Sequence, residues 1–263
     1  MSKLSLCIAV HNEANTIHYA IDSVIDIVDE IVIVDGCSDD GTKEKALSYG
    51  EKIHFIDEIN RPMFHINKQK ALENAVGEWI IQLDADEALS DELKNEIKEI
   101  ISSWKVGSPV AYWIPRKNLF LTRFLEKGGQ YPDYTIRLYR RGFAYFPCES
   151  VHEQVAVNGE IGFLQKPIMH YADPDFSRYL MRWNRYTSVD AEILAKKSNL
   201  GFYTFFLYFF WKPFCWFFLT YFRHKGFYDG FPGFVFSLFS ALRFLVIYVK
   251  AWSLKRSSFT HCF

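Results

Sequence analysis

The N-terminal third of the chain alternates between short apolar runs and segments with apolar residues at helical spacing. Apolar runs of strand length cover residues 4–10, 30–34, 53–56 and 79–83. The segments between them predict helices over about 14–27, after 41–42, and over 65–76. Strands and helices that alternate at this spacing predict an α/β fold, with a mostly parallel sheet flanked by helices.

Polar residues stand where three of these strands end. His11, Asp35 and Asp84 each follow an apolar run, and ligands of such sheets bind beyond the carboxyl ends of the strands. In an extended chain Asp84 and Asp86 would point the same way, and two converging carboxylates repel unless a cation lies between them. Such oxygen ligands suit Mg²⁺ or Mn²⁺, which often carry substrate phosphates as well. The alternative is a solvated acidic turn before a helix capped by Ser90.

The composition narrows the class of protein. A net charge of −1 gives no basic footprint, so we expect no nucleic-acid partner. Five cysteines without paired spacing indicate reduced thiols in a cytosolic setting, rather than a disulfide scaffold or a zinc site. No G-x-G-x-x-G sequence follows the first strand, so the usual dinucleotide fingerprint is missing. Residues 36–43 miss the P-loop pattern because Thr42 and Lys43 stand in the reverse order.

Three motifs, taken together, resemble those of the family-2 GT-A glycosyltransferases. They are His-Asn-Glu at 11–13, Val-Asp-Gly-Cys-Ser-Asp-Asp-Gly-Thr at 34–42 and Leu-Asp-Ala-Asp-Glu at 83–87. The similarity covers about the first 150 residues. Other stretches are similar to the bacterial, β-glucosyltransferase-like branch that adds a hexose to the lipopolysaccharide core. These stretches are 68–72, 132–134, 137–141, 151–153 and 226–230.

The resemblance implies a GT-A (Rossmann-like) fold, a nucleotide-sugar donor and a divalent cation, Mg²⁺ or Mn²⁺. It implies that Asp86 is the chief metal ligand, with His152 as a further candidate, and that Asp35 contacts the base or ribose. Lys68 and Arg137 are candidate contacts of the diphosphate, because cationic side chains suit phosphate oxygens. The expected nucleotide-sugar-binding residues are Ala9, Val10, His11, Glu13, Asp35, Lys68, Asp84, Ala85 and Arg137.

The resemblance also implies a single displacement with inversion at the anomeric carbon. Such a reaction needs a carboxylate that accepts the proton of the acceptor hydroxyl. Asp133 falls where the family places its catalytic acid, although Pro132 replaces the acidic residue that usually precedes it. Glu153 is the second candidate for the base. A turn residue after proline and a surface strand residue are the ordinary alternatives for Asp133 and Glu153.

Aromatic residues make up 18% of the chain and crowd into its last quarter. The apolar stretches 202–222 and 231–252 are each long enough to span a bilayer, which takes about 20 residues of helix. Pro213 and the basic connector 223–225 argue against simple crossing, since proline interrupts a helix and basic loops favour the cytoplasm.

The second aromatic stretch carries its polar residues on one side of a helix. That side holds Ser237, Ser240, Arg243 and Lys250, beside a large apolar face. The pattern is typical of a helix that lies in the membrane interface. A pair of core helices packed on the catalytic domain and a hairpin through the bilayer are the alternatives.

Together these patterns predict a catalytic domain over 1–175 and a helical, aromatic-rich, membrane-associating region over 176–263. The expected partners are a nucleotide-sugar donor of the UDP-glucose type, a lipid-linked glycan acceptor such as the lipopolysaccharide core, and the membrane surface. The expected location is the cytoplasmic face of the bacterial inner membrane. A sugar nucleotidyltransferase and a catalytically inactive membrane-bound GT-A scaffold are the alternative functions.

Overall fold

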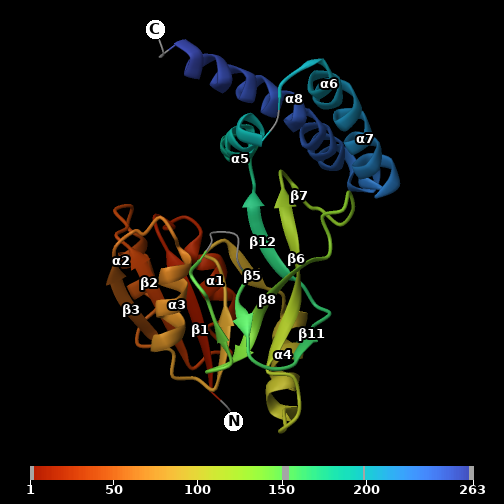
Figure 1. The fold of residues 1–263 in the computed structure, drawn as a ribbon. Coiled ribbons are helices and arrows are strands. Elements are labelled where there is room, and N and C mark those ends of the chain that lie inside the picture. Colours follow the sequence, from red (N-terminus) through yellow and green to blue (C-terminus); the bar gives the residue numbers. More distant parts are fainter. Residues whose placement is uncertain (1–2, 150–153, 198, 261–263) are drawn as a thin grey trace. The chain divides into compact units, whose positions relative to one another are not determined.

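The computed structural model describes residues 3–149, 154–197 and 199–260 (Figure 1). The chain forms two compact units. The first comprises residues 1–117 and 133–170, and the second comprises 118–132 and 171–263. The sequence placed the division near residue 175, so the structure moves 118–132 from the predicted catalytic domain to the C-terminal unit.

A mixed sheet forms the framework of the first unit. Its parallel half has the order β3-β2-β1-β4, made of Ile53–Glu58, Glu30–Gly36, Leu4–Val10 and Trp79–Gln82. β8 (Asp133–Arg140) pairs antiparallel with β4 and with β6 (Ala111–Phe120). Beyond β6 the sheet continues with β12 (Ile168–Asp173) and ends with β5 (Glu87–Leu89). The predicted parallel strands are therefore confirmed, and an antiparallel half follows them.

Several short strands complete the β-structure of the described residues. β7 (Arg123–Phe124) and β11 (Ile161–Phe163) pair with β6, antiparallel and parallel respectively. β9 (Ala144–Tyr145) and β10 (Ala156–Val157) form a separate antiparallel pair.

Four helices accompany the sheet of the first unit. They are α1 (Ile17–Val24), α2 (Thr42–Leu47), α3 (His65–Asn74) and α4 (Asp91–Ser103). Side chains alternate along β1, and this places α1 and α4 on one face of the sheet and α3 on the other. Leu6 and Ile8 pack in one hydrophobic cluster with α1 and α4, whereas Cys7 packs in another with α3. The Ser90 hydroxyl accepts the Leu93 N–H at 3.2 Å, so the predicted cap of α4 is confirmed.

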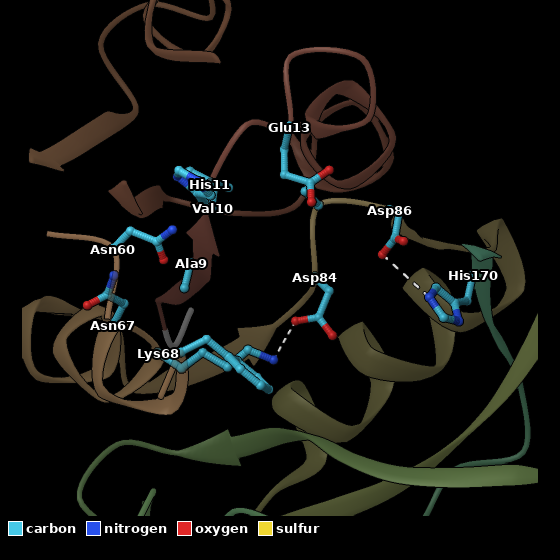
Figure 2. Close-up of a pocket in the computed structure, with 12 residues that line it drawn as sticks. Ala9, Val10, His11, Glu13, Asn60, Asn67, Lys68, Asp84, Asp86 and His170 are labelled. Carbon is cyan, nitrogen blue, oxygen red and sulfur yellow. Dashed lines mark ion pairs between the residues drawn. The ribbon is translucent and has the colours of Figure 1, made fainter. Parts of the chain in front are cut away.

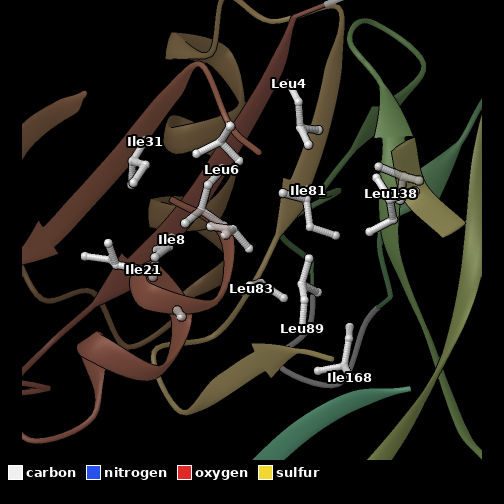
Figure 3. Packing of buried hydrophobic residues seen from close by; sticks show 14 of the residues in the cluster. Leu4, Leu6, Ile8, Ile21, Ile31, Ile81, Leu83, Leu89, Leu138 and Ile168 are labelled. Atoms are coloured by element: carbon white, nitrogen blue, oxygen red, sulfur yellow. The ribbon is translucent and has the colours of Figure 1, made fainter. Parts of the chain in front are cut away.

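The hydrophobic core fixes where β1 and β4 end. Leu6 and Ile81 are neighbours in the parallel register, and both are fully buried together with Ile8 and Leu83 (Figure 3). Burying an aliphatic side chain of this size stabilises a fold by about 1.5–3 kcal/mol. The core therefore holds the carboxyl ends of both strands side by side, and the polar residues that follow are held with them.

The second unit is helical apart from its strand ends. α5 (Phe176–Lys197) is followed by α6 (Phe202–Phe206), η1 (Leu207–Trp211), α7 (Lys212–Phe217), η2 (Phe218–Arg223), η3 (Gly226–Asp229) and α8 (Gly230–Thr260). η1 and η2 are wider π-helical turns on either side of α7. Pro213 lies in α7 and has no N–H to donate to the preceding turn, and wider turns accommodate such gaps.

The polar side of α8 faces the interior of the second unit. Ser237 is fully buried, and Lys250 Nζ donates hydrogen bonds to α5 at Asn184 Oδ1 (2.7 Å) and Thr187 Oγ1 (2.8 Å). Large aromatic residues instead lie exposed. They are Phe202, Tyr203, Phe206, Phe210, Trp211, Phe214, Phe218 and Phe222. Of the polar stripe that the sequence showed, Lys250 thus contacts α5, whereas Ser237 lies close to Gly226 of η3.

Two helical stretches of the second unit meet the length and composition of membrane spans. They are Phe202–Arg223 and Gly226–Arg256, with mean hydropathies of 1.2 and 1.8. None of the apolar window of the first stretch is buried, and a third of the second is. Core helices of soluble proteins pass the same composition test, so the criterion by itself assigns no membrane topology.

Candidate active site

A cavity of about 350 Å³ opens beyond the carboxyl ends of β1 and β4 (Figure 2). Its lining comes from the end of β1 and the segment after it, from α3 and the loop before it, from the turn after β4, and from β12. The lining residues are Ala9, Val10, His11, Glu13, Asn60, Phe64, Asn67, Lys68, Asp84, Ala85, Asp86 and His170.

The acidic motif forms a turn and does not continue the strand. β4 ends at Gln82, and the Glu87 N–H donates to the Asp84 carbonyl at 3.0 Å. Glu87 Oε2 in turn accepts the Asp84 N–H at 3.0 Å. The expectation that alternation along an extended strand aims Asp84 and Asp86 in one direction is therefore wrong. Both carboxylates line the same cavity, but each has a different partner.

The Asp84 carboxylate is held by two cations. Lys68 Nζ lies 2.5 Å from Oδ1, and Arg137 Nη2 lies 2.6 Å from Oδ2 (Figure 2 shows the first of these). Burial by itself raises the pKa of this carboxyl, but Arg137 and Lys68 outweigh it and hold the pKa well below its usual range. Burial lowers the pKa of Lys68, and Asp84 opposes that shift. Asp84 is therefore a fixed anion that orients two cations at the floor of the cavity.

Asp86 turns toward a histidine from a distant part of the chain. His170 Nε2 lies 3.5 Å from Asp86 Oδ1 (Figure 2). The position of His170 follows from strand pairing, because it lies opposite Glu87 in the antiparallel register of β12 and β5. A carboxylate oxygen and an imidazole nitrogen that converge in this way are donors that Mn²⁺ accepts.

A chain of ion pairs extends from Asp84 to residues of β8, β5 and β6. Arg137 Nη2 lies 2.8 Å from Glu87 Oε1, and Arg116 Nη1 lies 2.9 Å from the same oxygen. The other arm of Arg116 binds Asp133 Oδ2 through Nη2 at 2.7 Å and through Nε at 3.0 Å. Arg116 and Asp133 are direct register partners on β6 and β8. The network thus links the acidic turn to the candidate base.

Most of the predicted nucleotide-sugar-binding residues meet in the cavity. Those that line it are Ala9, Val10, His11, Glu13, Lys68, Asp84 and Ala85, and the predicted metal ligand Asp86 lines it as well. Arg137 lies beneath, against a neighbouring cavity of about 210 Å³, with its guanidinium bonded to Gln82, Asp84 and Glu87. This arrangement makes Arg137 a support of Asp84 within the protein.

Asp35, a predicted nucleotide contact, is not among the residues that line the cavity. Asp35 is buried at the end of β2, where its carboxylate accepts the Ser38 N–H at 3.0 Å and also the Ser38 hydroxyl. Its register partner on β1 is Val10, so it belongs to the same edge of the sheet. His152 and Glu153 fall outside the described residues. His170, Glu87 and Arg116 were not assigned a role from the sequence.

A mixed sheet flanked by helices, with an acidic turn beside a cavity at the carboxyl ends of its parallel strands, defines a GT-A glycosyltransferase fold. The model of the glycosyl transferase family 2 matches residues 5–152, and the chain belongs to this family of glycosyltransferases. The recognition and the fold class predicted from the sequence are confirmed.

Three similar proteins illustrate the relationship. An uncharacterized glycosyltransferase of Rickettsia felis is 33% identical in an alignment of 263 positions. This alignment covers 93% of this chain and 88% of that protein. The lipopolysaccharide core biosynthesis glycosyltransferase LpsC of Rhizobium meliloti is 28% identical over 173 residues, 62% of this chain and 61% of that protein. Mannosyltransferase PcManGT of Pyrobaculum calidifontis, solved with GDP-Man and Mn²⁺, shares the fold with a TM-score of 0.52 and 14% identity. That alignment covers 95% of this chain and 87% of that one.

Proposed function

We propose that this glycosyltransferase is divalent-cation-dependent and inverting, and that it moves a hexose from a nucleotide-sugar, of the UDP-glucose type, to a lipid-linked envelope glycan. The acceptor is of the lipopolysaccharide core type, and the enzyme works at the cytoplasmic face of the inner membrane. The pairing of Asp86 with His170 beside the cavity is the observation that carries this proposal.

The donor atoms at this position, one carboxylate oxygen and one imidazole nitrogen, fit Mn²⁺ better than Mg²⁺, which prefers oxygen ligands. Asp86 Oδ1 and His170 Nε2 lie 3.5 Å apart, and among the described residues no third His, Cys, Asp or Glu joins them as a cluster. A cation held by this pair takes its remaining ligands from substrate phosphates and water. When bound, such an ion offsets the charge that develops on a departing diphosphate.

The protein groups around this pair have separate roles in the proposal. Lys68, buried beside Asp84, supplies a fixed positive charge toward the diphosphate. The segment from Ala9 to Glu13 borders the nucleotide. Asp133 accepts the proton of the acceptor hydroxyl, and Arg116, which donates to its Oδ2 at 2.7 Å, holds the carboxylate in position.

The lipid-linked acceptor is supported by two further observations. LpsC is named for lipopolysaccharide core biosynthesis and resembles 62% of this chain. The second unit exposes eight aromatic side chains between Phe202 and Phe222 among its described residues, and large exposed apolar patches mark surfaces for membranes or partners. A surface of this kind would bring a lipid-held acceptor and a soluble donor to one enzyme.

The direct test measures release of nucleoside diphosphate from a panel of nucleotide-sugars, in the presence of lipopolysaccharide-core acceptor. We expect release with Mn²⁺ or Mg²⁺ and loss with a chelator. Asp86→Asn and His170→Ala should each lower the rate at least about a hundredfold, because the loss of several kcal/mol of charge stabilisation has this effect. Asp57→Asn and His54→Ala are matched controls, since both residues lie exposed on β3.

The same assay separates the alternatives. Release of pyrophosphate in place of nucleoside diphosphate would identify a nucleotidyltransferase, and no release from any donor would identify an inactive scaffold. Full activity of both site variants would overturn the proposed metal position. A thermal-shift series of nucleoside diphosphates with and without Mn²⁺ identifies the nucleotide, because a bound ligand raises stability by mass action.

A further inference from the structure

A second cavity, of about 320 Å³, lies inside the helical unit, far in sequence from the acidic turn. It is formed by α5, η1 and α8. Its lining residues are Asp190, Ile193, Leu194, Lys197, Tyr208, Arg243, Phe244 and Ile247. The family resemblance gives this cavity no role.

Cationic groups dominate the polar part of this lining. Arg243 and Lys197 face a single acid, Asp190. Lys212 adds a third positive charge nearby, since its Nζ lies 3.7 Å from the centre of the Tyr208 ring. The cavity therefore carries net positive charge, which favours an anionic ligand.

Arg243 is half-buried, and its Nε atom is fully enclosed. Its guanidinium carbon lies 4.6 Å from the Trp216 ring centre and 4.9 Å from that of Phe244. The aromatic contacts satisfy the cation in part, but among the described residues Nε is enclosed and has no hydrogen-bond acceptor. A buried donor left in this state costs about 1–3 kcal/mol, and phosphate oxygens match the planar fork of an arginine.

The rest of the lining is apolar and continues to an exposed surface. Leu194 and Ile247 belong to a buried cluster, whereas Ile193 is 46% exposed. The neighbouring helical stretch from 202 to 223 has no buried share in its apolar window. A ligand that fits both parts has an anionic head and an aliphatic chain.

We propose that this cavity binds the phosphodiester headgroup of an anionic membrane phospholipid. The phosphate lies against Arg243 and Lys197, and the first carbons of the acyl chain lie against Tyr208, Phe244 and Ile247. Basic pockets between membrane-associated helices bind anionic headgroups in this way. The proposal rests on the membrane attachment proposed above and adds lipid selectivity to it.

Vesicle flotation of the full chain tests this site. One set of vesicles contains phosphatidylcholine alone, and the other contains added phosphatidylglycerol. We expect the wild-type protein to float with both and to partition more strongly into the anionic vesicles. Arg243→Gln should reduce the phosphatidylglycerol-dependent partition about fivefold, the usual effect of one basic contact near the surface. Its partition into phosphatidylcholine should stay unchanged.

Lys196→Gln is the matched control, because Lys196 is adjacent to Lys197 on α5 and exposed but outside the cavity. Lys197→Gln, at the rim, is a second variant should Arg243→Gln lower the thermal stability. Equal losses in Lys196→Gln and Lys197→Gln would mean diffuse surface attraction and would overturn the site. Failure to float with phosphatidylcholine would contradict the attachment itself, whereas equal flotation of wild type with both vesicles would contradict only this inference.

Inorganic phosphate would offer Arg243 and Lys197 the same oxygen acceptors as a lipid headgroup. Thermal shifts with inorganic phosphate and with short-chain phosphatidylglycerol separate the two. We expect the lipid to raise the melting temperature of wild type and to raise that of Arg243→Gln less, with no shift from inorganic phosphate. A shift from inorganic phosphate equal to that from the lipid would make this a site for soluble anions and would overturn the commitment to a lipid.

Discussion

Both units of this chain have apolar cores, but the first also buries charged residues and the second also exposes large apolar ones. The first buries charge, since Glu87 is fully enclosed and Arg137 and Lys68 are only 5% and 7% exposed. The second exposes apolar surface, since Phe202 and Phe214 are 83% and 70% exposed. Buried charges are tolerated when each has opposite partners, and here they underlie the acidic turn. Apolar residues exposed in such number indicate a surface that contacts lipid or a protein partner.

The largest expected effect tests the exposed aromatic surface. Phe206→Ser/Phe210→Ser/Phe214→Ser changes three side chains that are 51%, 54% and 70% exposed. Each phenylalanine contributes up to about 1.5–3 kcal/mol when it enters an apolar phase, so partition into phosphatidylcholine vesicles should fall about a thousandfold. Fractionation and vesicle flotation measure the change.

The control for this triple variant comes from the first unit. Val106→Ser changes a residue that is 92% exposed, and we expect it to leave partition unchanged. If the triple variant still floats as wild type does, the aromatic surface does not contact lipid. It would then bind a protein partner. Circular dichroism should show the same helix content in all variants, because none of these side chains is buried.

The second prediction concerns the end of the buried ion-pair network. Asp133→Asn should lower the transfer rate at least about a hundredfold with little change in the KM for the donor, because a general base acts on the acceptor proton. Glu153→Gln, assayed beside it, decides between the two predicted bases. A large loss in Glu153→Gln with near-normal Asp133→Asn would move the base to Glu153 and leave Asp133 as the structural partner of Arg116.

The third prediction breaks the network at its centre. Glu87 Oε1 receives both Arg116 and Arg137, so Glu87→Gln leaves two buried cations with less compensation. Breaking such a buried pair destabilises a protein by about 3–5 kcal/mol. Chemical denaturation, with hydrogen exchange at β4 and β5, should assign the loss to the first unit. Glu92→Gln, in the exposed first turn of α4, is the control and should change stability little.

Much of the first unit was predictable from local patterns. The apolar runs predicted the four parallel strands β1 to β4. Ligands bind beyond the carboxyl ends of such strands, and this rule predicted that His11 and Asp84 lie at one cavity. His170 could not be found in this way, because its position opposite Glu87 depends on an antiparallel pairing across about eighty residues of chain. The partners of Glu87 likewise come from β6 and β8. Long-range pairing leaves no periodic signal in one sequence.

The second unit shows the converse limit. Helical spacing grouped Ser237, Ser240, Arg243 and Lys250 on one side of a helix. Periodicity gives the grouping but not the direction that each residue faces: Ser237 is buried, and Lys250 donates to α5. α8 also buries apolar residues, among them Val235, Ile247 and Ala251. The pattern of polar residues in the sequence therefore does not decide which side of this helix is packed.

The smallest expected effect tests the contact between Lys250 of α8 and α5. Lys250→Met removes hydrogen bonds from Nζ to Asn184 Oδ1, Thr187 Oγ1 and Ser188 Oγ. Bonds of a charged donor contribute about 1.5–3 kcal/mol, so the helical unit should lose about that much stability in detergent. Lys196→Met, an exposed lysine of α5, should change stability by less than about 0.5 kcal/mol. If Lys250→Met is instead as stable as Lys196→Met, polar contacts do not hold α8 to α5. The apolar cluster that joins Ala191 and Leu194 of α5 to Ile247 and Ala251 of α8 would then hold the two helices together.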